Sequence, residues 1–101
     1  AFVVARLQGR PVGCGMLRQI DPSVGEIKRM WVSPDVRGMG VASRILGRLE
    51  HAARELGWNL VRLDTNRTLA EAQAMYRKAG YREIGRYNDN PYADFWFEKE
   101  L

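Results

Sequence analysis

Residues 31–42 read WVSPDVRGMGVA, and this stretch decides how the chain is interpreted. It runs from an apolar strand through a proline turn into an Arg-Gly loop that opens an amphipathic helix. The first amides of a helix have no partner inside it, and the aligned peptide dipoles leave that end partly positive. Gly38 and Gly40 lack a Cβ atom, so a bulky anion can approach the backbone closely, and Arg37 adds a donor fork suited to phosphate. The stretch therefore predicts a cradle for a phosphorylated cofactor.

Two kinds of nucleotide site use such a cradle, and the residues fit them unequally. The nucleotide P-loop requires G-x-x-x-x-G-K-[ST], and the chain has no Gly-Lys pair. The dinucleotide fingerprint G-x-G-x-x-G is met by residues 38–43 except for its last glycine. That fingerprint normally follows its strand directly, whereas several residues, including Pro34, come between it and Val32. Asp64 would have to be the ribose-binding acid, although it comes later than the usual ~20 residues. A dinucleotide-binding module stays as an alternative.

A third pattern fits residue by residue. Residues 37–42 (RGMGVA) fit [QR]-x-x-G-x-[GA] and resemble the acetyl-CoA signature of the GNAT N-acetyltransferase superfamily. Residues 32–35 (VSPD) resemble the V-x-P lead-in of that family, and residues 76–81 (YRKAGY) match its later Y-x-x-x-G-[FY] segment. The three matches occur in the family's order and spacing. The resemblance extends over nearly the whole chain, from about residue 2 to residue 101.

The resemblance implies an N-acetyltransferase that moves an acetyl group from acetyl-CoA, its cosubstrate, directly to a primary amine of a small molecule or protein, without a metal. A catalytically inactive domain that senses acyl-CoA is a further alternative. The residues expected to contact the cofactor are Met30, Trp31, Val32, Arg37, Gly38, Met39, Gly40, Val41, Ala42, Ser43 and Asn66.

Two side chains are candidates for acid–base catalysis. Glu26 opens a strand where many members of the resembling family carry a carboxylate near the acetyl group, which suggests a base for the attacking amine. The alternative is a water-facing glutamate paired with Lys28 or Arg29. Tyr76 stands at the family's tyrosine position, and its phenol suits protonation of the departing thiolate. The alternative is an aromatic residue that only packs.

Periodicity predicts the order β-β-β-α-β-α-β-β, an α/β fold with a mixed sheet of about six strands and two helices. Strands are expected over residues 2–7, 12–20, 26–32, 59–65, 81–87 and 92–100. An amphipathic helix is expected from Val41, ended by Gly57, and a second from a capping box at residues 68–71, closed by Gly80. Asn66 would end its strand and either contact the pantetheine arm or serve the turn.

Composition and net charge limit the kinds of partner that the chain is expected to bind. The 101 residues suffice for a single domain, expected over residues 1–101, with a net charge of +4 spread singly rather than in blocks. Nucleic-acid and membrane binding are not expected, whereas a homodimer is possible. The lone Cys14 favours a reducing, cytoplasmic location.

Members of the resembling family usually begin with a further strand and helices that line the acceptor cleft. Since this sequence opens in a strand, we expect a trimmed or minimal core.

Overall fold

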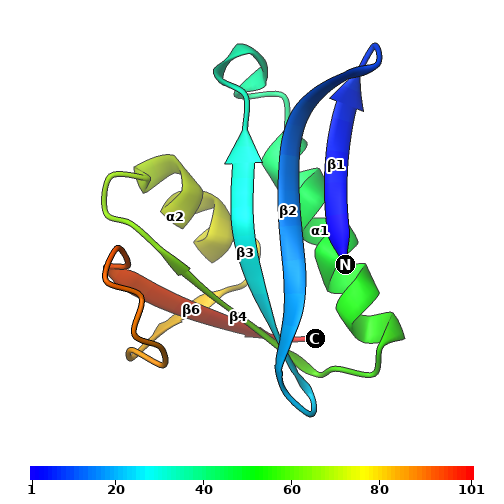
Figure 1. Cartoon of the computed structure of the whole chain (residues 1–101). Coiled ribbons are helices and arrows are strands. Elements are labelled where there is room, and N and C mark those ends of the chain that lie inside the picture. Colours follow the sequence, from blue (N-terminus) through cyan, green and yellow to red (C-terminus); the bar gives the residue numbers. More distant parts are fainter.

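The computed structural model describes residues 1–101 and contains one mixed six-stranded sheet in the order β1-β2-β3-β4-β6-β5. The strands are β1 (Phe2–Leu7), β2 (Arg10–Asp21), β3 (Val24–Val32), β4 (Leu60–Thr65), β5 (Arg82–Ile84) and β6 (Phe95–Glu100). The helices are α1 (Val41–Glu55), α2 (Ala70–Lys78) and a 3-10 turn over Pro34–Val36. The predicted mixed fold with two α helices is confirmed (Figure 1).

Only one strand pair in the sheet is parallel. β3 and β4 run side by side in the same direction because α1 crosses over between them, and every other pair is antiparallel. The apolar stripe of α1 and the inner face of α2 share one core with the sheet, in which Ile45, Leu49, Tyr76 and Phe97 are buried. Both helices therefore lie on the same face, and the other face carries polar side chains.

Glycines in β2 allow α1 to approach the sheet. A Cβ atom built on Gly15 would lie 2.7 Å from the sulfur of Met30 and 2.9 Å from Ile45 Cγ2. Such distances force neighbouring side chains or the helix to move. We expect Gly15→Ala to lower the free energy of unfolding by about 1–3 kcal/mol in urea titrations. Gly85→Ala is the matched control, because its Cβ would meet nothing within 4 Å. Equal free energies of unfolding for the two variants would show that α1 can move away from β2 without a loss of stability.

The second helix begins differently from the prediction. Its N-cap is Leu69, without a side-chain cap, so the predicted capping box is wrong. Thr68 is occupied elsewhere, because its amide and hydroxyl both donate to Asn66 Oδ1, at 2.9 and 2.8 Å. The side chain of Asn66 thus forms the local turn in competition with the cap. The predicted glycine stops are confirmed, since Gly57 (φ +80°) and Gly80 (φ +98°) follow the helix ends in the left-handed region.

The two final strands are shorter than the predicted ranges 81–87 and 92–100. They cover only Arg82–Ile84 and Phe95–Glu100. The intervening residues leave the sheet because Tyr87, Asn88 and Asn90 hydrogen-bond to carboxylates of β3 and β4 instead. Side-chain amides of this kind compete with ladder pairing.

The parallel strands separate half-way along their length. Their pairing is confined to Val24–Ile27 of β3 and Leu60–Leu63 of β4. Further on, β3 stays paired with β2 through a bulge at which Arg29 has φ +57°, while β4 stays paired with β6. The strands diverge in Figure 1 from this point. The divergence, called the splay below, leaves one edge of β3 unpaired. Neither α1 nor α2 has the length and hydrophobicity of a membrane-spanning helix.

Candidate active site

A groove of about 800 Å³ lies at the splay. Its walls are the unpaired end of β3, the end of β4, the loop before α1, and α2. Of the residues predicted to contact the cofactor, the groove is lined by Met30, Trp31, Val32, Arg37, Gly38, Gly40, Val41, Ala42, Ser43 and Asn66. The structure therefore gathers residues from distant parts of the chain around one elongated space.

The loop before α1 forms one end of the groove. Gly38 (φ +82°) and Gly40 (φ +75°) are in the left-handed region, and Gly40 is the N-cap of α1. The amides of Gly38, Gly40, Val41, Ala42 and Ser43 donate to no backbone acceptor. No acidic residue lies in the first turn of the helix. These features make the loop a suitable binding site for a phosphate group.

Met39 is the predicted contact that lies outside this groove. Its side chain is 59% exposed and lines a separate hollow of about 330 Å³ between β1 and α1. Its amide donates to Val36 O at 3.3 Å. Neither its side chain nor its amide is therefore offered to the groove.

Tyr76 reaches the groove from α2. Its ring is buried and packs edge-on against Tyr81, with the ring centroids 5.8 Å apart. It also packs at a tilt against Phe97, with the ring centroids 6.2 Å apart. Burial, with a smaller contribution from the Asp64 charge, raises the pKa of Tyr76 to about 12. The hydroxyl has no hydrogen-bond partner within the protein, and the residue lines the groove. A fixed phenol that keeps its proton is suitable as a general acid.

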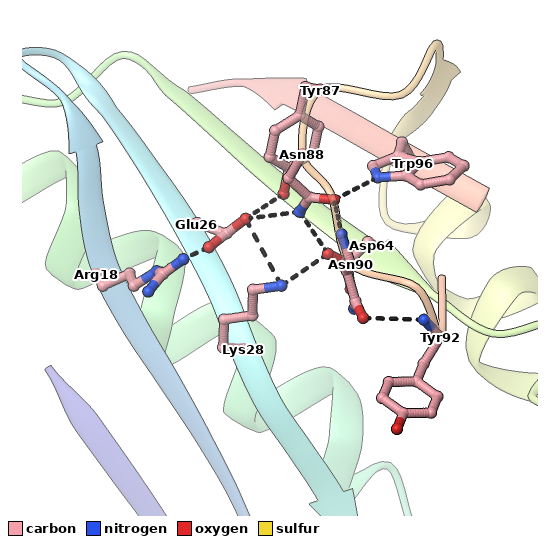
Figure 2. A network of polar contacts seen from close by, with 9 residues as sticks. All are labelled: Arg18, Glu26, Lys28, Asp64, Tyr87, Asn88, Asn90, Tyr92 and Trp96. Atoms are coloured by element: carbon pink, nitrogen blue, oxygen red, sulfur yellow. Dashed lines mark hydrogen bonds and ion pairs between the residues drawn. The ribbon is translucent and has the colours of Figure 1, made fainter. Parts of the chain in front are cut away.

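Glu26 lies on the sheet face opposite the helices and is 1% exposed (Figure 2). Its Oε1 accepts a hydrogen bond from Arg18 Nε at 2.8 Å. Its Oε2 accepts from Tyr87 Oη at 2.6 Å and from Asn88 Nδ2 at 3.2 Å. Burial and the Glu26 carboxylate together raise the pKa of Tyr87, so this phenol remains a donor. Glu26 is thus a buried, fully hydrogen-bonded carboxylate rather than the water-facing residue of the alternative.

Asp64 connects this network to the groove. Its Oδ2 accepts hydrogen bonds from Lys28 Nζ at 2.7 Å and Asn88 Nδ2 at 2.6 Å, and its Oδ1 accepts from Asn90 Nδ2 at 3.1 Å. Burial acts to raise the pKa of Asp64, but these hydrogen bonds and the Lys28 charge together hold it below its ordinary value. Lys28 also lies 3.7 Å from Glu26 Oε2. We call this network the carboxylate cluster. It comprises Glu26, Lys28, Asp64 and Asn88, together with the side chains that donate to them, which are Arg18, Tyr87, Asn90 and Trp96.

Within this cluster, the sequence predicted a catalytic role for Glu26 and indicated Asp64 only as the ribose-binding acid of the dinucleotide alternative. A carboxylate that follows Arg62 in a strand with Leu60, Val61 and Leu63 was the available signal for Asp64. Asn88 and Asn90 lie in a stretch of turn-forming residues that is equally typical of an ordinary hairpin turn.

Asn66 lines the groove, but its side chain bonds within the protein. Its Nδ2 donates to Tyr92 O at 2.8 Å, and its Oδ1 accepts from Thr68. The structure thus gives this side chain a turn-forming role. Nearby, Asp94 pairs with Arg67 at 3.0 Å, a contact that ties the loop before β6 to the loop after β4.

Known proteins resemble this chain in sequence and in fold. The sequence profile described as "Acetyltransferase (GNAT) family" matches residues 1–81. The IAA acetyltransferase of Azospirillum brasilense is 38% identical over 104 residues, covering 99% of this chain and 67% of that protein. Several other curated N-acetyltransferases are covered over only 31% to 64% of their lengths.

Solved structures agree with this assignment of the fold. A GNAT-family acetyltransferase from Staphylococcus aureus has a TM-score of 0.93 at 21% identity, covering 99% of this chain and 67% of that one. A GNAT-family acetyltransferase from Elizabethkingia anophelis with acetyl-CoA bound has a TM-score of 0.84 at 17% identity, covering 99% of this chain and 75% of that one.

Proposed function

The chain belongs to the acetyltransferase (GNAT) family, and we propose that it transfers an acetyl group from acetyl-CoA to a primary amine, with Glu26 as base and Tyr76 as acid. The observation that carries this proposal is the groove at the splay. Free helix amides lie at one end of it, and Tyr76 and Asp64 line the same space. The acceptor is a small molecule or a protein.

The residues present fit coenzyme A. The free amides of Gly38, Gly40, Val41, Ala42 and Ser43 would bind the pyrophosphate, and Gly40, which has no side chain, leaves that surface open. The unpaired edge of β3 at Met30, Trp31 and Val32 would offer main-chain groups to the pantetheine arm. The thioester would then lie toward Tyr76.

The reaction needs two proton transfers. As the amine nitrogen attacks the thioester carbonyl, a C–N bond forms, and the amine proton passes to the Glu26 carboxylate. As the tetrahedral intermediate collapses, the C–S bond breaks and Tyr76 donates its proton to the sulfur. Glu26 is 1% exposed and does not line the groove, so we propose that a water carries the proton to it. Cys14 takes no part in this scheme, since its thiol bonds to Arg29 O.

Two measurements on the whole chain test the proposal. Thermal unfolding with CoA, NAD or ATP should show stabilisation by CoA, because a ligand at 100 times its Kd adds about 2.7 kcal/mol. Release of free CoA thiol from acetyl-CoA should then depend on at least one amine in a broad panel. CoA binding without transfer to any amine would favour the acyl-CoA sensor, and stabilisation by NAD alone would favour the dinucleotide module.

The role of Tyr76 gives a prediction of its own. Tyr76→Phe removes the acidic proton but retains the ring that packs against Tyr81 and Phe97. We expect kcat to fall about 100-fold or more, with CoA affinity within about twofold of wild type. Tyr81→Phe is the control, because it removes a buried hydroxyl that donates to Glu50 at 2.8 Å and should reduce stability only. Equal kcat values for Tyr76→Phe and wild type would assign the proton to another donor.

A further inference from the structure

Asn88 uses every hydrogen-bonding position of its side chain inside the carboxylate cluster (Figure 2). Its Nδ2 donates to Glu26 Oε2 at 3.2 Å and to Asp64 Oδ2 at 2.6 Å. Its Oδ1 accepts from Trp96 Nε1 at 2.9 Å and from Asn90 N at 3.3 Å. Because the indole N–H can only donate, it must face the amide oxygen, and the NH₂ group must then face the carboxylates. The orientation of the amide is therefore set by its surroundings.

This amide stands where the two parallel strands separate. Their last paired residues are Ile27 and Leu63, and the carboxylates that Asn88 contacts come from positions next to these, Glu26 on β3 and Asp64 on β4. Asn88 itself belongs to the connection between β5 and β6. One side chain from a third segment thus bonds to both sides of the splay at its origin.

We propose that Asn88 is a positioning residue for acetyl transfer, whose amide holds the Glu26 carboxylate in place and joins it to Asp64 across the splay. The inference rests on the proposed role of Glu26 as base. A neutral donor to a carboxylate favours the ionised form of that carboxylate, which is the form that accepts a proton. Asn88 does not line the groove, so its effect on the reaction passes through Glu26.

Other charged and titratable groups also surround Glu26, and the test must leave them unchanged. They are Arg18 from β2, Lys28 from β3, Arg62 and Asp64 from β4, and Tyr87 from the β5–β6 connection. Arg62 pairs with Glu98, and its guanidinium lies 5.6 Å from the centre of the Tyr87 ring. A substitution at Asn88 replaces none of these groups.

Asn88→Asp tests the proposal with a minimal change of shape. It keeps an oxygen for Trp96 and Asn90 but turns a carboxylate oxygen toward Glu26 and Asp64. A like charge at this distance disfavours ionisation of Glu26. In an NMR titration of the Glu26 side-chain carbon in the protein alone, the midpoint should rise by about one pH unit or more. The acid limb of kcat/KM should move in the same direction with any accepted amine, while CoA affinity stays within about twofold.

Asn90→Asp is the matched control. The variant retains an oxygen that accepts the hydrogen bond from the Tyr92 amide. Its new charge faces Asp64 but not Glu26. Its effect on the Glu26 midpoint should be clearly smaller than that of Asn88→Asp. Asn88→Ala, which removes the donors without adding a charge, should raise the midpoint by a lesser amount and remains informative if the aspartate variant fails to fold.

An unmoved Glu26 midpoint in the folded Asn88 variants, or a shift no larger than that of Asn90→Asp, would overturn the proposal. Failure of the proposed function gives a different result. In that case Glu26→Gln would leave the rate and its acid limb intact, whereas the Glu26 midpoint would still respond to Asn88.

Discussion

Gly40→Val is expected to weaken CoA binding on the order of 100-fold, a loss of about 2.7 kcal/mol. Gly40 has φ +75°, which β-branched residues rarely adopt, and it caps the helix end where free amides would meet the pyrophosphate. A Cβ atom at this position meets no protein atom within 4 Å, so the substitution causes no clash in the free protein. The loss should come from backbone strain and from a side chain that occupies the space of the anion. Calorimetric titration with CoA measures it.

Gly9→Val is the control for a valine at a left-handed glycine outside this loop. Gly9 has φ +81° and also has nothing within 4 Å of a built Cβ atom, but it lies in the turn between β1 and β2. This variant should lose stability as Gly40→Val does and yet bind CoA as the wild type does. Wild-type affinity in folded Gly40→Val would mean that the loop does not bind the pyrophosphate.

Glu26→Gln is expected to lower kcat/KM by about 100-fold or more at neutral pH, because the amide cannot take the amine proton. A base must be ionised to act, so the wild-type rate should have an acid limb. The variant should lack this acid limb and regain part of the rate at high pH, where more of the amine is already neutral. CoA affinity should stay nearly constant, since Glu26 does not line the groove.

Glu98→Gln is the matched control for Glu26→Gln. Glu98 is a second buried carboxylate on the same sheet face, one strand beyond β4, where it pairs with Arg62 and Arg82. Its loss should reduce stability without altering the pH–rate profile. If both variants have the same profile as the wild type, the amine proton goes to solvent or to another residue.

The sequence predicts the elements of the fold well where the signals are local. The apolar stripe from Val41 to Leu56 predicts the first helix, and the glycines at 57 and 80 predict where the two helices end. The structure confirms both predictions. The capping box fails because Asn66, outside the predicted helix, captures the amide and hydroxyl of Thr68. That competition depends on the backbone path between β4 and α2, which no local pattern contains.

The site is predictable only in part. A glycine pattern predicts the loop before α1 as the phosphate end that we propose, and a motif position predicts Tyr76 as the proposed acid. The carboxylate cluster, by contrast, brings together residues that are far apart in the chain, such as Glu26 with Asn88 and Lys28 with Asp64. Their partnership depends on where β3 and β4 stop pairing, and strand pairing is a property of the folded sheet. An isolated asparagine in a turn-rich segment carries no sign of such a role.

The path of the acetyl group itself tests the proposed transfer most directly. The chain is incubated with acetyl-CoA that carries a heavy-isotope acetyl group and with the amine panel, and mass spectrometry then locates the label. Direct transfer predicts the label on the nitrogen of an amine, one released CoA thiol for each acetylated amine, and an unlabelled protein. Intact acetyl-CoA after incubation with every amine, or thiol release without an acetylated amine, would contradict it.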